Sequence, residues 1–138
     1  MKRCLLDSSF VIDLLNEIAD SDGEGPALNW LRKNSRAQLW ISPVTLAEVL
    51  EGAQDPQAVK AYLGRYGWQG IHRVQAEKCA LRQSRVANRM GENDAWQTAT
   101  AECMKAIVLG HDRAFERLGA GYEDHRRIGT KTGKAKRD

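Results

Sequence analysis

Short apolar runs alternate along this chain with stretches of helical periodicity, and this alternation restricts the fold more than any other feature. The runs at 4–6, Gln38–Ile41 and 106–109 do not alternate apolar and polar residues, as a strand with one solvent-exposed face does. Strands of this kind, separated by helices, form a parallel sheet buried on both sides. We therefore predict an α/β domain with a short, mostly parallel central sheet.

The helices are predicted from capping residues and from prolines suited to a first turn. Ser42 followed by Pro43 begins a helix that Gly52 ends, and Asp55 followed by Pro56 begins another. The other predicted elements are helices at 8–17, from Pro26, at 75–90, 92–105 and 113–118, and strands at 70–74 and near Tyr122.

Composition indicates one globular domain of ordinary type. The 138 residues are 42% hydrophobic and 28% charged. We see no apolar run long enough to span a bilayer and no signal-peptide pattern at the start, so we expect a cytoplasmic protein without a membrane partner. The odd number of cysteines fits buried thiols in a reducing compartment, and the histidines show no spacing typical of zinc ligands.

Positive charge is concentrated at the end of the chain. Residues 126–138 hold six of the 21 Lys and Arg residues but only one of the 18 acidic residues, leaving 15 basic and 17 acidic residues before them. We predict a folded domain over 1–124 and a basic, mobile tail over 125–138. The tail is either a solubilising end or a segment that attracts polyanions weakly.

Four acidic residues are placed where they can meet. Asp7 and Asp112 each follow an apolar strand-like run, so both leave a parallel sheet at its carboxyl edge, where ligands bind in open α/β sheets. Asp94 lies in the first turn of a helix, which right-handed crossovers bring to that edge. Glu48 lies within the helix after Pro43, and its side chain leans back toward the helix N-terminus.

Each acid also has a purely structural explanation. Asp7 and Asp112 could simply cap the helices that follow them. Asp94 could be in a first turn because the helix dipole favours an acid there, and Glu48 could be an exposed residue beside Glu51. As a group, converging carboxylates repel one another unless a cation neutralises them. Oxygen-only ligands suit Mg²⁺ or Mn²⁺, which activates water and offsets charge on a phosphate. The constellation therefore indicates metal-dependent phosphodiester hydrolysis.

Four segments in order carry a family resemblance: LLDSSFVIDLL, ISPVTLAEVLEG, GENDAWQTATA and IVLGHDRAF. Through them, residues 2–118 resemble the PIN-domain nucleases, especially the toxin ribonucleases of VapBC-type toxin–antitoxin pairs. The resemblance implies a three-layer α/β/α sandwich, an RNA substrate, a homodimer and inhibition by a small antitoxin.

The same resemblance assigns roles to individual residues. It implies that Mg²⁺ or Mn²⁺ is held by four acids: Asp7, Glu48, Asp94 and Asp112. It also implies supporting roles for Ser8 and Asn93. The sequence departs from the family at Gly110, where a Thr with its hydroxyl is common, and in the unusually polar GAGYEDH segment.

Contacts to RNA are predicted from a basic stripe on the 75–90 helix. Lys78, Arg82, Arg85 and Arg89 share this stripe, which is either a phosphate-guiding rim or an ordinary solvated face. Trp68, in a glycine-flanked loop, is the best candidate for base stacking. The other tryptophans fit core or interface positions.

The leading hypothesis is a toxin that acts as a metal-dependent endoribonuclease. Two alternatives share the fold: a nuclease of RNA processing outside a toxin pair, and a non-catalytic PIN-like binding module. A third is a phosphotransferase with Asp7 as nucleophile. That chemistry usually needs a second Asp two residues later, where this chain has Ser9.

Overall fold

A parallel sheet forms the centre of the molecule. The computed structural model describes residues 2–127, and within them the strand order is β3-β2-β1-β4-β5 with every neighbouring pair parallel. The strands are β1 (Arg3–Leu6), β2 (Gln38–Ile41), β3 (Gly67–Trp68), β4 (Ile107–Gly110) and β5 (Tyr122–Asp124).

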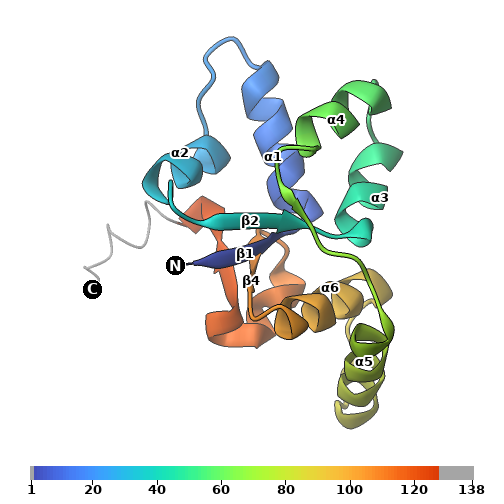
Figure 1. Cartoon of the computed structure of the whole chain (residues 1–138). Helices are drawn as coiled ribbons and strands as arrows, with labels where there is room; N and C mark the ends of the chain where they lie inside the picture. Colours follow the sequence, from blue (N-terminus) through green and yellow to red (C-terminus); the bar gives the residue numbers. More distant parts are fainter. Residues whose placement is uncertain (1, 128–138) are drawn as a thin grey trace, which may run out of the picture.

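Helices cover the sheet on both faces. Figure 1 shows α1 to α4 on one side and α5 and α6 on the other, which confirms the predicted three-layer α/β/α sandwich. Within residues 2–127, every helix is too short or too polar to span a lipid bilayer. The helical segments are α1 (Ser8–Ala19), α2 (Pro26–Lys33), α3 (Pro43–Glu51), α4 (Pro56–Leu63), α5 (Arg73–Arg85), α6 (Glu92–Cys103) and the 3₁₀ segments η1 (Arg113–Gly121) and η2 (His125–Arg127).

Two core clusters sandwich the sheet, because successive strand residues point to opposite faces. On β1, Cys4 and Leu6 pack with Phe10 of α1, whereas Leu5 packs with Val108 and the α5–α6 layer. All five residues are fully buried. The central strands therefore read as continuous apolar runs, as the sequence predicted.

Local capping explains where α1, α3 and α4 begin. The side chains of Asp7, Ser42 and Asp55 each accept a hydrogen bond from a backbone N–H of the following turn. Pro43 and Pro56 then occupy first-turn positions, where a missing N–H is harmless. These starts agree with the sequence predictions.

The edge strand β3 corrects one prediction. The sequence indicated a loop around Trp68 and a strand at 70–74, but the strand is Gly67–Trp68 and pairs with Trp40 and Ile41. A Cβ on Gly67 would lie 2.5 Å from the ring of Trp40, so glycine permits this close approach. A strand this short leaves no periodicity to detect.

Helix α5 is shorter than the predicted 75–90 helix. It ends at Arg85, and Val86 is extended. The side chain of Gln83 then bonds both backbone groups of Met90, accepting from N at 3.2 Å and donating to O at 2.9 Å. This side-chain bridge replaces the last predicted helical turn, so Arg89 lies outside the helix.

The last described residues belong to the folded body, which corrects the predicted domain boundary at 124. The ring of His125 is buried against Phe10, at a centroid distance of 4.8 Å. His125 Nε2 lies 2.8 Å from Asp13 Oδ2, and Arg126 donates two hydrogen bonds of 2.9 Å to the same carboxylate. The remainder of the predicted tail, 128–138, lies outside the described residues.

Candidate metal centre

Strands β1 and β4 bring two of the predicted acids to one edge. Leu6 and Leu109 are paired in register at the strand ends, and Asp7 N donates to Leu109 O at 2.8 Å. Asp7 follows β1 directly, and Asp112 follows β4 after one intervening residue, His111. The two side chains therefore start from adjacent, rigid strand ends.

Asp7 is a buried carboxylate, with 3% of its surface exposed. Its Oδ2 accepts hydrogen bonds from Ser9 N at 3.2 Å and Ser9 Oγ at 2.7 Å. Burial raises the pKa of Asp7, and the charges of Glu48 and Asp112 raise it further, while both bonds from Ser9 lower it. The side chain thus caps α1 and also belongs to an acidic cluster.

Glu48 is fixed by both predicted supporting residues. Ser8 Oγ donates to Glu48 Oε1 at 2.7 Å, and Asn93 Nδ2 donates to Glu48 Oε2 at 2.9 Å. These bonds join α1, α3 and α6 across the carboxyl edge of the sheet. Glu48 is therefore oriented into the site and not turned away beside its neighbour on α3.

A buried polar network that sequence reasoning missed holds α3 and α6 in these positions. Thr45 Oγ1 donates to Leu6 O at 2.6 Å and accepts from Gln97 Nε2 at 2.8 Å. Gln97 Oε1 in turn accepts from Ser42 Oγ at 2.5 Å. In the sequence, the only sign of this network is that Thr45 and Gln97 are polar residues at helix positions that face the core. Fully satisfied networks of this kind fix a unique packing.

Asp94 and Asp112 complete the cluster. The pKa of Asp94 is raised to about 6, first by burial and then by the charges of Asp112, Asp7 and Glu48. Asp112 Oδ1 accepts from Ala114 N at 2.9 Å and so caps η1. Asp94 therefore lies close enough to each of the other three predicted acids for their charges to act on its carboxyl.

The donor chemistry of this cluster fits a hard divalent cation. All four side chains offer carboxylate oxygens, which Mg²⁺ and Mn²⁺ prefer. Within residues 2–127, no three His, Cys, Asp or Glu side chains converge closely enough to enclose an ion as they stand. Burial and the charges of nearby acids both disfavour the ionised forms of Asp7 and Asp94, and a bound cation would offset both effects.

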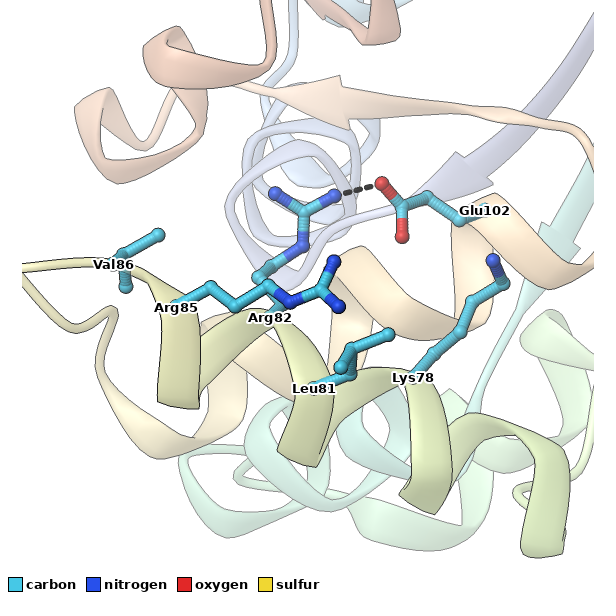
Figure 2. A pocket seen from close by; sticks show the side chains of 6 residues that line it. All are labelled: Lys78, Leu81, Arg82, Arg85, Val86 and Glu102. Atoms are coloured by element: carbon cyan, nitrogen blue, oxygen red, sulfur yellow. Dashed lines mark hydrogen bonds and ion pairs between the residues drawn. The ribbon is translucent and has the colours of Figure 1, made fainter.

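The predicted basic stripe divides into paired and unpaired cations. A groove of about 300 Å³ beside α5 is lined by Lys78, Arg82, Arg85 and Glu102, and Figure 2 shows Arg82 paired with Glu102. Among the described residues, Lys78 and Arg85 have no hydrogen-bond or ion-pair partner. Arg89 is exposed in the loop after α5.

Together, the parallel sheet and its carboxylate-bearing strand ends define an α/β domain of the kind that binds ligands at the carboxyl ends of its strands. Comparison with known families makes the class specific: residues 4–121 match the PIN domain family. The chain belongs to the PIN domain family. No curated protein matches its sequence.

Solved structures share the fold at low sequence identity. A chain of a toxin–antitoxin complex from Klebsiella pneumoniae has a TM-score of 0.71 and 22% identity, covering 88% of this chain and 97% of that one. A chain of DNA-bound VapBC from Salmonella typhimurium has a TM-score of 0.70 and 20% identity, covering 91% of this chain and 99% of that one. VapC20 from Mycobacterium tuberculosis, a sarcin–ricin loop cleaving toxin, has a TM-score of 0.63 and 17% identity, and the match covers 84% of this chain and 95% of that one.

Proposed function

We propose that this chain is a Mg²⁺- or Mn²⁺-dependent endoribonuclease that acts as the toxin of a toxin–antitoxin pair. The observation that carries the proposal is the buried Asp7 at the end of β1, in electrostatic contact with three further acids of a PIN domain. Asp7, Glu48, Asp94 and Asp112 would hold the cation. When bound, it would activate a water and neutralise charge on the scissile phosphate.

The chain's own residues provide the positioning. Asp7 follows β1 directly and Asp112 lies two residues after β4, and the pairing of these two strands keeps the two backbones close together. Ser8 and Asn93 each bind one oxygen of Glu48 and so fix the plane of its carboxylate. Such outer hydrogen bonds orient metal-binding groups and typically change metal affinity by about 10- to 100-fold when removed.

RNA cleavage in vitro tests the nuclease. We expect cleavage with Mg²⁺ or Mn²⁺, none with a chelator, and none by folded Asp7→Asn or Asp94→Asn. Asp22→Asn, an exposed acid in the loop after α1, is the matched control and should cleave normally. If folded, metal-loaded wild type cleaves no RNA, the chain is a binding module; if the two acid variants cleave equally well, the site is misassigned.

The basic residues near α5 are proposed to bind RNA phosphates. Arg85 and Arg89 are exposed, and Arg85 has no ion-pair partner within the described residues. Arg82 is instead paired with Glu102, so we expect it to add positive charge to this surface without contacting a phosphate directly. Arg85→Glu combined with Arg89→Glu should weaken RNA binding by Asp7→Asn protein and reduce its dependence on salt. Unchanged binding would mean that these side chains form only a solvated surface.

The toxin assignment is supported by the toxin–antitoxin complexes among the structural neighbours. Induced expression of wild type should arrest growth, and Asp7→Asn should not. Equal growth with both would favour a nuclease of RNA processing outside a toxin pair.

An apolar groove beside Glu48 supports an antitoxin partner. It has a volume of about 470 Å³ between α1, α3 and α4, and Ile12, Leu15 and Val49 line it together with Glu48. We propose that it takes an apolar antitoxin segment whose Lys or Arg faces Glu48. An antitoxin that restores growth when it is co-expressed with wild type should fail to do so with Ile12→Asp. Equal rescue of both would exclude this groove.

A homodimer is also proposed, with Trp68 at its interface. Trp68 is 52% exposed and borders a groove of about 220 Å³ with Leu46 and Tyr66. Sedimentation should give a dimer for wild type and a monomer for Trp68→Glu. A wild-type monomer would leave Trp68 available for base stacking.

A further inference from the structure

Ser9 connects the two strand ends that carry the acids. Its hydroxyl donates to Asp7 Oδ2 at 2.7 Å and accepts from His111 N at 2.9 Å, one residue before Asp112. The second bond crosses from α1 to the chain leaving β4. A single side chain therefore contacts both segments that lead into the acidic cluster.

Helix capping does not require this hydroxyl. The N-terminus of α1 is already capped by the bond from Ser9 N to Asp7 Oδ2 at 3.2 Å. The hydroxyl adds a short bond to a charged acceptor, and such charge-assisted bonds are the stronger and more directional ones. Asp7 Oδ2 is thereby engaged twice, while Asp7 Oδ1 accepts no hydrogen bond from the described residues.

Gly110 provides the room for this arrangement. A Cβ at position 110 would lie 2.6 Å from Ser9 Oγ and 2.9 Å from Asp7 Cβ, both closer than atoms can approach. Any side chain on Gly110 would displace the Ser9 hydroxyl. The glycine at the end of β4 and the serine in the first turn of α1 are thus sterically matched.

We propose that Ser9 is a positioning residue of the candidate metal centre. Its hydroxyl fixes the rotamer of Asp7, leaves Oδ1 without a hydrogen bond from the described residues and so open to a cation, and holds the backbone of His111, the residue before Asp112. This inference rests on the proposed function, because it assigns Ser9 a role toward the metal that the four acids would bind.

The test is Mn²⁺ binding in the absence of RNA, measured by calorimetry and by the electron paramagnetic resonance signal of free Mn²⁺. Ser9→Ala should weaken Mn²⁺ binding by about 10- to 100-fold, as loss of an outer hydrogen bond typically does. Ser9→Thr, which keeps a hydroxyl, should recover most of the affinity. Ser84→Ala, at the exposed end of α5, is the matched control and should bind as wild type does.

Urea unfolding of the same proteins shows whether a loss of Mn²⁺ affinity comes from misplaced ligands or from a loss of folding stability. If folded Ser9→Ala binds Mn²⁺ as tightly as wild type, Ser9 has no positioning role. If Ser9→Ala is unfolded, Ser9→Cys replaces it, because a thiol is only a weak donor and acceptor. Weaker Mn²⁺ binding by folded Ser9→Cys supports the role, and wild-type affinity refutes it. If wild type itself binds no Mn²⁺, the proposed function and this inference fail together.

Discussion

Removing the charge of Asp94 should stabilise the metal-free protein at neutral pH. The pKa of this carboxyl is raised from its ordinary value of 3.8 to about 6, first by burial and then by Asp112, Asp7 and Glu48. The unfolded chain therefore loses this proton at lower pH than the folded chain. Stability consequently falls as pH rises from 3.8 to about 6, and the loss is complete above that.

The size of the effect follows from the shift. A rise from 3.8 to about 6 corresponds to about 3 kcal/mol, because each pH unit is worth ~1.4 kcal/mol. Asp94 is only partly buried, and solvent screening reduces this to about 1–2 kcal/mol. Asp94→Asn should therefore raise the free energy of unfolding by that amount at pH 7.5 and by almost nothing below pH ~4.

Urea unfolding of wild type and Asp94→Asn with a chelator, over a series of pH values, measures this difference. Added Mn²⁺ should make wild type more stable than Asp94→Asn, because the ion stabilises only a protein that binds it. The gain is about 2.7 kcal/mol at a hundredfold excess over the dissociation constant. Asp22→Asn should show neither effect. A variant that is equally or less stable than wild type at every pH would refute the assignment of Asp94 to a crowded acidic cluster.

Three further substitutions test the surroundings of the site. Asp13→Asn should lower the free energy of unfolding by about 1.5–3 kcal/mol at pH 7. Hydrogen bonds to Asp13 hold its pKa below 3.8, so the difference in stability between wild type and Asp13→Asn should vanish as the pH falls below that value. A stability difference that persists in acid would contradict this role of Asp13. Thr45→Val should cost about 1–3 kcal/mol by leaving buried polar groups unpaired, and an unchanged urea midpoint would argue against the network. Gly67→Ala should cost about 1–3 kcal/mol and alter near-ultraviolet circular dichroism as Trp40 moves, and an unchanged spectrum would refute that contact.

Much of the fold was predictable because its signals are local. A short apolar run ending in Asp7 indicated a strand followed by a helix, and Ser42 with Pro43 marked the start of α3. Strand–helix alternation then predicted the parallel sheet, which the structure confirms. The acids could be selected because strand ends and first turns share one edge in such a sheet.

The parts that could not be predicted depend on contacts between distant segments. Gln83 ends α5 by bonding Met90, although helix propensity and periodicity favoured a longer helix. Gln97 reaches Thr45 from another helix, and Ser9, in the first turn of α1, accepts a hydrogen bond from His111 in the segment that follows β4. Each of these bonds joins residues that no local pattern relates, so only the assembled fold reveals them.

The origin of the oxygen in the cleavage products tests the central claim most directly. RNA is cleaved with Mn²⁺ in ¹⁸O-water, and the new termini are analysed by mass spectrometry. Attack by metal-activated water forms a new P–O bond and breaks the bond to the leaving oxygen, so each new terminal phosphate should carry one solvent oxygen, with no 2′,3′-cyclic phosphate. Asp7→Asn should yield no products. Cyclic phosphate termini that form without metal and persist in Asp7→Asn would contradict a metal-dependent hydrolase centred on Asp7.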